Sequence, residues 1–503
     1  MASRHRDIGR CSVKRGPFLL TLLPDFVAAG REAEFLAFVF NVIKYNAAYL
    51  DDDMIESFIR HINKLCSYSK RDEDVQESLS VLDAILLYSH LPKTALHLFI
   101  CTLCITVNLE KFVSISWKQM RNLMGTNIGH TVIHYLCVIL QDVVHHPDSR
   151  IVRGAVYFIG NALWGPNKVQ TLTHPPSTII PSFLKAVGRK DKIVAYEVIL
   201  ALNKLLMEHG DELTHRSLIW DAMLEVVEKI LLCPEFHSTT PPLSTYTKSL
   251  HDFINAAEEK CPEQSYESLY KIVYQSSEFR NVQSILKLIA FKEKKLKVYN
   301  PDFIPDFTEL IEKFFKNESR PAVQLETVRF IERVRLKTLC YFEDDLIDQI
   351  ILQQLTHTVS VLDVSVRKEA VQLLINMADT DSPCFFEILE IIEKILKHVL
   401  DTIKSNDNEI QSCSDVVAAV EGLIHVFKKK LFDSKPGHCI EIFNILVRHL
   451  EQQYESTRYE EDLIKSRKMI IEFSLQIRAN KRRQIGIVSD GTVKYCLFLL
   501  CPE

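Results

Sequence analysis

The sequence predicts an all-α protein made of stacked helix pairs, and the first observation behind this prediction is a shortage of glycine. Only 14 of the 503 residues are Gly, against an average usage of about 7 %. Folds with many turns need glycine for backbone conformations with positive φ. The shortage therefore disfavours large β-sandwiches, β-barrels and nucleotide-binding α/β folds, whereas long helices need few glycines.

The second observation is helical periodicity, which recurs from near residue 25 to near residue 480. In residues 218–231 the apolar pairs 218/219, 222/223, 226/227 and 230/231 share one face of an α-helix. Proline-rich breaks, such as residues 173–177 and 234–244, separate such segments. We expect about twenty helices joined by short loops, with antiparallel neighbours and no strand.

The third observation is a repeated helix pattern, which is clearest in residues 363–374. They read D-x-x-V-R-x-x-A-x-x-L-L, the pattern of the second helix of a HEAT repeat. Asp363 is placed to cap the helix. Arg367, four residues later, is the arginine of the pattern. The expected inner face consists of Val366, Ala370, Leu373 and Leu374.

Weaker copies of this pattern begin at Asp74, Asp148, Asp191 and Glu318. The steps from 148 to 191 and from 318 to 363 are 43 and 45 residues, within the roughly 40–47 residues of HEAT and armadillo repeats. The sequence therefore predicts a HEAT/armadillo-like α-solenoid of about ten antiparallel helix pairs. A non-repeating α-bundle that uses Asp as N-cap is the alternative.

The expected organisation has three parts. Residues 1–24 form an irregular, basic N-terminal segment, residues 25–480 form the solenoid, and residues 481–503 form a C-terminal tail. Weaker joints within the solenoid are expected near 145–150, 233–247 and 404–415. Because a solenoid buries apolar surface only between neighbouring repeats, it has no obligatory catalytic cleft, and binding is its default function.

Charge and cysteine usage exclude several classes of protein. Lys and Arg number 60 against 65 Asp and Glu, so the chain lacks the positive field that nucleic-acid binding requires. No segment is long and apolar enough for a transmembrane helix. The 13 Cys are scattered without framework spacing, which is typical of reduced thiols in a cytosolic or nuclear protein.

The sequence lacks the common motifs of catalytic and nucleotide-binding sites. There is no phosphate-binding loop, dinucleotide fingerprint, H-E-x-x-H or G-x-S-x-G motif, so we predict no catalytic residue and no cofactor. His130, His134 and Cys137 could share a helix face as metal ligands, but no fourth ligand is suggested, and we predict packing and capping instead of a metal site. Cys101 and Cys104 are interpreted as core thiols.

Two segments stand out from the repeats. Residues 117–130 and 152–165 together hold five of the 14 Gly and two of the three Trp. Glycine permits close approach of helices and tight C-terminal caps, and aromatic rings fill the gaps that remain. We therefore expect closely packed helices at these two positions.

These segments carry a resemblance to a known family. The stretches W-K-x-M-R-N-L-x-G-T-x-x-G-H and R-G-A-V-x-F-x-G-x-A-L-W-G resemble the N-terminal helical region of the tuberin family, and weaker resemblance extends over about residues 25–495. The signature residues are Trp117, Arg121, Asn122, Gly125, Gly129, His130, Arg153, Gly154, Gly160, Trp164 and Gly165. We expect them to have structural roles.

The resemblance implies a non-catalytic scaffold subunit of a tuberin–hamartin-like complex. In the family, that complex activates GTP hydrolysis by the small GTPase Rheb and negatively regulates TOR signalling. We expect this chain to bind a hamartin-like protein and to act on a Rheb-type GTPase only indirectly, since we expect it to end before any GTPase-activating domain. The implied location is the cytoplasm and the nucleus, with peripheral recruitment to lysosomal or other membranes through partners.

Two alternatives remain open at this point. A HEAT-repeat nuclear transport receptor or another adaptor protein would share the fold, because fold alone is weak evidence for function. An enzyme that uses the face formed by His130, His134 and Cys137 is the other. Binding to Ran-type GTPases or to Phe-Gly peptides would favour the first alternative, and stoichiometric zinc would favour the second.

Overall fold

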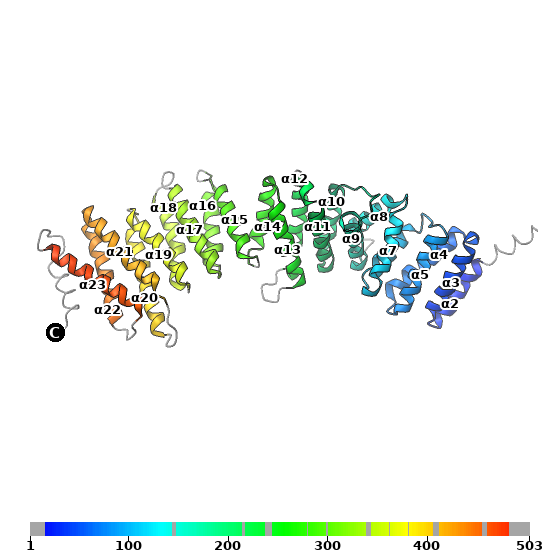
Figure 1. Cartoon of the computed structure of the whole chain (residues 1–503), viewed down its shortest axis with the longest axis horizontal. Helices are drawn as coiled ribbons and strands as arrows, with labels where there is room; N and C mark the ends of the chain where they lie inside the picture. Colours follow the sequence, from blue (N-terminus) through cyan, green and yellow to red (C-terminus); the bar gives the residue numbers. More distant parts are fainter. Residues whose placement is uncertain are drawn as a thin grey trace, which may run out of the picture. The chain divides into compact units, whose positions relative to one another are not determined.

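The structure of the chain is a computed structural model that is α-helical throughout the part it describes (Figure 1). It describes residues 16–142, 147–213, 217–236, 244–278, 280–297, 300–338, 344–361, 363–380, 382–405, 412–454 and 460–481. These residues form 22 α-helices and a few short 3₁₀ or π turns, with no strand. The predicted all-α fold is confirmed.

The helices belong to two compact units, and the division falls between Arg280 and Asn281. The sequence did not indicate a joint at this position. The helices of the first unit are α2 Gly16–Ala28, α3 Glu32–Asn46, α4 Asp52–Tyr68, α5 Asp72–Tyr88, α6 Leu96–Thr106, α7 Val113–Met124, α8 Gly129–Gln141, α9 Ser149–Trp164, α10 Pro176–Val187, α11 Lys192–Leu213, α12 Ser217–Ile230, α13 Thr245–Lys260 and α14 Tyr266–Gln275.

The second unit continues the same architecture. Its helices are α15 Val282–Lys295, α16 Phe303–Ile311, α17 Pro321–Thr338, α18 Asp344–Leu355, α19 Val364–Asp379, α20 Phe385–Ser405, α21 Ser414–Phe432, α22 Pro436–Tyr454 and α23 Glu461–Lys481.

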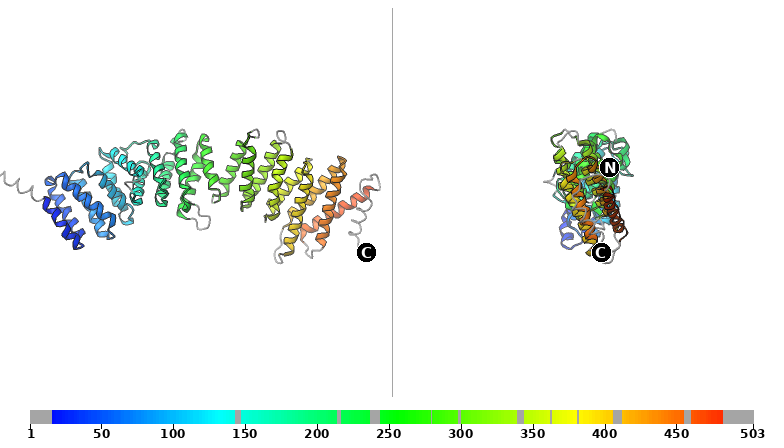
Figure 2. Two further views of the ribbon diagram at one scale, coloured as in Figure 1. Left: turned by 180° about the vertical axis from the view of Figure 1, so that it is seen from behind. Right: turned by 90° about the vertical axis from the view of Figure 1, so that its left-hand side faces the viewer.

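Within each unit the helices form two layers. In the second unit α15, α17, α19, α21 and α23 pack in succession, and α18, α20 and α22 form the other layer. Helices of the same layer therefore lie next to one another along the unit, and helices of the two layers alternate in the chain (Figure 2). This is the arrangement of an α-solenoid, in which each repeat buries its apolar face against its neighbours.

Helix α19 shows how the repeat sequence produces this packing. The carboxylate of Asp363 accepts hydrogen bonds from the backbone N–H groups of Ser365 and Val366, so it caps the helix. The inner-face side chains are fully or almost fully buried: Val366, Ala370, Leu373 and Leu374. The guanidinium of Arg367 donates to the carboxylate of Asp415 on α21 over 2.6 Å.

Polar contacts between successive repeats report the repeat length directly. Gln119 donates to the backbone carbonyl of Leu79, 40 residues earlier. Lys204 donates to Asn161 across 43 residues, and Asn376 to Glu332 across 44 residues. The structural period therefore agrees with the spacing of 43 and 45 residues that the sequence indicates.

Two details differ from the sequence-based expectations. Helix α2 begins at Gly16, so the helical region starts before the expected boundary at residue 24; a proline at position 17 fits the first turn of a helix, where its missing N–H is not needed. Asp74 does not open its helix: α5 begins at Asp72, and the buried Asp74 carboxylate accepts hydrogen bonds from Arg71 and Ser69.

Several expectations lie partly outside the described residues. They concern residues 1–15 of the N-terminal segment, residues 482–503 of the tail, and parts of the three expected joints, namely 145–146, 237–243 and 406–411. Among the described residues, none of the helices has the length and hydrophobicity needed to cross a membrane.

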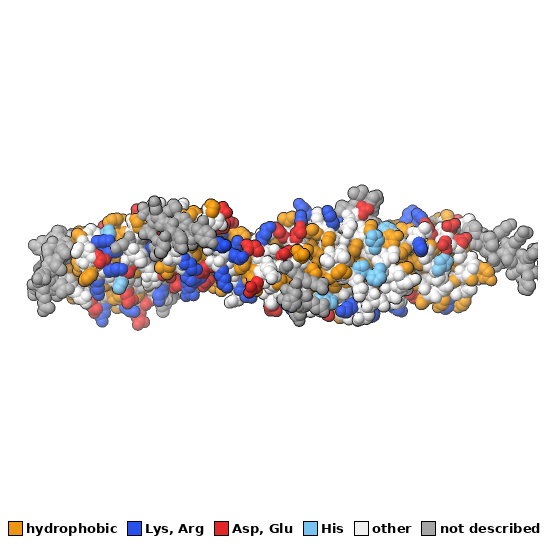
Figure 3. All heavy atoms as spheres, turned by 90° about the horizontal axis from the view of Figure 1, so that it is seen from above, with side chains coloured by type: hydrophobic (Ala, Val, Ile, Leu, Met, Phe, Trp, Pro, Cys, Tyr) orange, Lys and Arg blue, Asp and Glu red, His pale blue; other side chains and the backbone are white. Residues whose placement is uncertain are grey.

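Surface charge on the second unit is mixed in sign. On the face shown in Figure 3, acidic and basic side chains are interspersed over this unit. The second unit also contains ion pairs between neighbouring repeats, including Arg329 with Glu369 at 2.9 Å and Lys337 with Glu293 at 2.8 Å. Among its described residues, the visible part of that face therefore shows no broad field of one sign.

Candidate functional site

The regular alternation of layers breaks between α6 and α9. Helix α6 packs against α4 on one side and against α9 on the other, so these three helices share a layer. Helices α7 and α8 both lie in the opposite layer, where they pack against each other between α5 and α10. This repeat thus has three helices instead of two. The first signature segment, residues 117–130, lies in the additional helix α7 and its turn into α8.

Glycines of the second signature segment allow α9 to approach both of its neighbours. A Cβ atom at Gly154 would lie 2.2 Å from the backbone oxygen of Cys104 on α6. At Gly160 it would lie 2.9 Å from the Cβ of Ala201 on α11. Since backbone and alanine atoms cannot move aside, only glycine fits at these two positions.

The remaining signature glycines have other roles. Gly125 and Gly165 are the C-cap residues of α7 and α9, but their φ angles are −73° and −82°. Neither cap therefore uses the left-handed conformation for which glycine is usually selected. At Gly129 a Cβ would lie 2.1 Å from the carbonyl oxygen of Met124, and at Gly165 it would lie 2.9 Å from that of Asn161. Space is the constraint at these two positions.

The two signature tryptophans occupy different environments. Trp164 is buried and meets the ring of Phe183 edge-on at 5.7 Å. Trp117 on α7 is only half-buried. Its ring stacks on Phe158 of α9 at 6.3 Å and contacts Tyr157 edge-on at 6.5 Å. The two signature segments therefore meet through Trp117, which keeps part of its ring accessible.

A partly buried chain of hydrogen bonds links α9 to both of its neighbours. Arg153 donates hydrogen bonds to Asn108, which follows α6, and to the buried carboxylate of Glu197 on α11, each over 3.0 Å. Burial raises the pKa of Glu197, and the charges of Arg153 and Lys204 oppose that shift. The signature residue Arg153 thus links three consecutive repeats of this layer and has a structural role.

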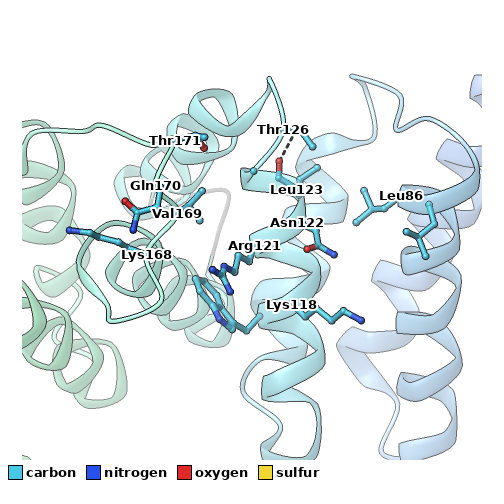
Figure 4. Close-up of a pocket in the computed structure, with 13 residues that line it drawn as sticks. Leu86, Lys118, Arg121, Asn122, Leu123, Thr126, Lys168, Val169, Gln170 and Thr171 are labelled. Carbon is cyan, nitrogen blue, oxygen red and sulfur yellow. Dashed lines mark hydrogen bonds between the residues drawn. The ribbon is translucent and has the colours of Figure 1, made fainter.

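A surface hollow of about 650 Å³ surrounds α7 (Figure 4). Its lining residues lie on both sides of this helix. Arg121 points toward the loop that contains Gln170 and Thr171, whereas Lys118 and Asn122 point toward Leu86 of α5. Trp117 and Gly125 line the same hollow, and so four of the signature residues, Trp117, Arg121, Asn122 and Gly125, come together at one surface site.

The hollow is positively charged. Its lining residues include Lys118, Arg121 and Lys168 and no Asp or Glu. In the part of the chain that the structure describes, no carboxylate forms an ion pair with any of these three side chains. The apolar part of the lining comes from Trp117, Leu86, Leu87, Leu123 and Val169, and Leu87 is 62 % exposed.

A second hollow, of about 770 Å³, lies on the other side of the loop and is lined by Trp164, His174 and His209, among others. Next to it, Nδ1 of His130 lies 2.9 Å from Nε2 of His174. Burial and the charge of His130 lower the pKa of His174. His130 therefore contacts a residue that the sequence pattern did not include.

His134 and Cys137 belong to the helix face that was considered as a metal site and for which packing and capping were predicted. His134 contacts the ring of its neighbour Tyr135, and Cys137 is a half-buried thiol whose pKa is raised by burial. Among the described residues no three His, Cys, Asp or Glu side chains are placed to hold a metal ion. Cys101 and Cys104 are buried thiols, and burial raises the pKa of Cys101 to about 12.

Sequence reasoning missed half of the hollow. Leu86, Leu87 and the loop residues 168–171 lie outside both signature segments, and the repeat spacing brings them to α7. The helical periodicity does not show that an apolar residue near the end of a helix, such as Leu87, stays exposed. The chemistry of the assembled site is that of binding, since it combines an accessible aromatic ring with cations and amides.

Comparison with known proteins gives matches along most of the chain. Residues 28–332 match the model of a domain of unknown function, DUF3384, and residues 411–503 match the family model named Tuberin. The structure of the TSC2 N-terminus aligns with a TM-score of 0.43 and 17 % identity, covering 53 % of this chain and 70 % of that chain. A homology model of the full-length AP-3 complex aligns with a TM-score of 0.32 and 10 % identity, covering 92 % of this chain and 90 % of that chain.

Proposed function

This chain belongs to the tuberin family, and we propose that it is the helical-repeat scaffold subunit of a tuberin–hamartin-like complex. DUF3384, which matches more than half of the chain, is the N-terminal domain of that family. The proposed partner is therefore a hamartin-like protein. The observation that carries the proposal is this family match, together with the exposed hollow built from the signature residues Trp117, Arg121 and Asn122.

The proposed contribution of the chain is binding. By its family relationship, the complex stimulates GTP hydrolysis by a Rheb-type small GTPase and restrains TOR signalling. The chain takes part in this activity indirectly, because the site formed by its signature residues contains cations, amides and an indole but no acid–base pair. Its place of action is the cytoplasm and the nucleus, with recruitment to membranes through its partners.

Co-purification tests this proposal. The purified 503-residue chain, mixed with hamartin at micromolar concentration, is expected to elute with it as one complex in size-exclusion chromatography. Separate elution of the two proteins would contradict the proposal. A second measurement addresses the non-catalytic role: the chain alone is expected to leave the rate of GTP hydrolysis by Rheb unchanged, and acceleration by the chain alone would overturn that part.

A further inference from the structure

We propose that the hollow around Trp117 receives an extended, carboxylate-rich segment of the partner protein, which crosses α7 from the α5 side to the loop at residues 168–171. This inference rests on the proposed function, since it specifies the chemistry by which this chain holds its protein partner. It assigns a recognition role to Lys118 and Arg121, two exposed cations that lie one helical turn apart on α7.

Charge is the first argument for this occupant. Lys118, Arg121 and Lys168 line a hollow that has no carboxylate among its lining residues, and none of the three is ion-paired within the described part of the chain. Some other surface cations of the described residues are paired, as Arg333 is with Glu293 and Glu326. A group of cations left without partners favours a negatively charged ligand, because complementary charge supplies specificity and accelerates association.

The arrangement of the side chains on α7 is the second argument. Trp117 and Arg121 are four residues apart and so lie on one side of the helix, as do Lys118 and Asn122 on the adjacent side. Figure 4 shows Arg121 directed toward the loop and Lys118 directed toward α5. A segment that crosses α7 therefore meets one cation on each side. The guanidinium of Arg121 can hold a carboxylate through two parallel hydrogen bonds.

Apolar side chains at the hollow are the third argument for this occupant. The Trp117 ring lies nearly parallel to that of Phe158, with the ring centroids 6.3 Å apart, and Trp117 remains partly exposed beside the hollow. Leu87 is 62 % exposed on the opposite wall. Tryptophan and arginine are the residue types most enriched among the residues that dominate binding energy at protein interfaces. The segment is thus expected to place an apolar side chain between acidic ones.

The size and the charge of the hollow favour a protein segment over a nucleic acid. Three cations are few compared with the six to ten phosphate contacts of a typical nucleic-acid site, and the whole chain carries a net charge of −5. A volume of about 650 Å³ accommodates a few side chains of an extended peptide. The hollow is therefore one anchoring point of a larger interface.

Charge reversal on α7 tests the inference in the full chain. Lys118→Glu combined with Arg121→Glu is expected to weaken hamartin binding by roughly tenfold or more at low salt, since like charges then face each other. Lys185→Glu is the matched control, because Lys185 is an exposed lysine of α10 outside the hollow. Dephosphorylated hamartin is used in all titrations, so that the anionic groups are carboxylates.

The outcomes separate the two proposals. If hamartin binds the wild-type chain and the double variant equally, the hollow inference fails while the proposed function stands. If hamartin does not bind the wild-type chain, both fail. If loss of binding requires phosphorylated hamartin, or if a single-stranded oligonucleotide binds the wild-type hollow and not the double variant, the carboxylate-rich occupant is wrong.

Crosslinking identifies the occupant directly. A photoreactive benzoylphenylalanine at position 87 replaces an exposed leucine at the rim, so the fold is expected to be retained. Irradiation of the complex is expected to attach a hamartin peptide rich in Asp and Glu, which mass spectrometry identifies. Attachment to a neutral or basic peptide, or to a second copy of this chain, would overturn the inference.

Discussion

The stretch α6–α9 in the first unit and the stretch α17–α22 in the second use the same helical building block differently. In α17–α22 the alternation of layers is regular, and charged side chains are paired inside the array: Arg335 with Asp348 at 2.8 Å and Arg367 with Asp415 at 2.6 Å. In α6–α9 a third helix interrupts the alternation, and Lys118 and Arg121 remain exposed without a described carboxylate partner.

This difference indicates that the regular helices contribute mainly to stability, whereas the surface of α7 is available for binding. In the regular region, buried charged side chains such as Arg335 and Arg367 are paired inside the array, and these pairs contribute to its stability. The additional helix α7 carries a half-buried indole and two exposed cations at the surface. We therefore expect substitutions in α17–α22 to change the free energy of unfolding, and substitutions on the surface of α7 to change binding.

The largest expected effect is on the buried ion pair of the regular region. Asp415→Ala leaves the guanidinium of Arg367 buried without its carboxylate, and removing one partner of a buried pair typically costs about 3–5 kcal/mol. Chemical denaturation measures this loss. The control is Glu369→Ala, which breaks the pair with Arg329, whose side chains are 47 % and 33 % exposed, and which is expected to cost less than about 1 kcal/mol. Equal losses for the two variants would contradict the distinction.

The next largest expected effect is on how the free energy of unfolding depends on pH, through a histidine of the same region. His449 on α22 is buried, its Nε2 atom lies 2.7 Å from Nε2 of Gln453, and burial lowers its pKa to about 4. The unfolded chain takes up this proton near pH 6.5, so stability is complete above that pH and falls between about pH 6.5 and 4, by up to ~3 kcal/mol.

Unfolding free energies measured from pH 7 to pH 4 test this. His449→Gln is expected to flatten the acid dependence, while the exposed His398 on α20 serves as the matched control, and His398→Gln should keep the wild-type slope. If the unfolding free energy of the His449→Gln variant falls with pH as steeply as that of the wild type, the buried imidazole of His449 is not the source of the acid dependence.

Alanine substitutions at two glycines of the irregular region are expected to change the free energy of unfolding by smaller amounts and in different directions. Gly154→Ala forces a Cβ against the backbone of Cys104, where 2.2 Å separates the atoms, and overpacking of this kind costs about 1–3 kcal/mol. Gly125→Ala meets no atom closer than 3.4 Å and has a φ of −73°, so it is expected to be neutral or stabilising by up to about 1 kcal/mol. Thermal unfolding distinguishes the two. Destabilisation by Gly125→Ala as large as that by Gly154→Ala would contradict the structure.

The smallest effect on stability is expected on the surface of α7. Arg121→Ala removes an exposed side chain that has no described ion-pair partner, so the unfolding free energy should change by less than about 0.5 kcal/mol. Hamartin binding should nevertheless weaken. A stability loss comparable to that of Asp415→Ala would place Arg121 among the structural residues instead.

The regular region could be predicted from the sequence to a large extent. The inner face of α19 follows directly from the spacing of Val366, Ala370 and Leu373, because only one face of a helix can be buried against its layer. The cap at Asp363 follows from its position and side chain. These properties depend on residues close together in the chain.

The candidate site was harder to predict, because it depends on contacts between distant segments. The periodicity of α7 does not show that α7 and α8 share a layer, and so it does not indicate that Leu87 and Gln170 lie beside Trp117. The glycine pattern predicted close approach, which holds at Gly154 and Gly160, but it also indicated C-caps dependent on glycine. Gly125 has an ordinary helical φ, so the residue type alone did not reveal its conformation.

Hydrogen–deuterium exchange of the chain with and without hamartin tests the central claim most directly, because it reads both regions in one measurement. We predict that binding increases protection in α7 and in the loop at residues 165–171, while α17–α22 keep their exchange rates. Increased protection confined to α17–α22, with α7 unchanged in the complex, would contradict the assignment of recognition to the irregular repeat.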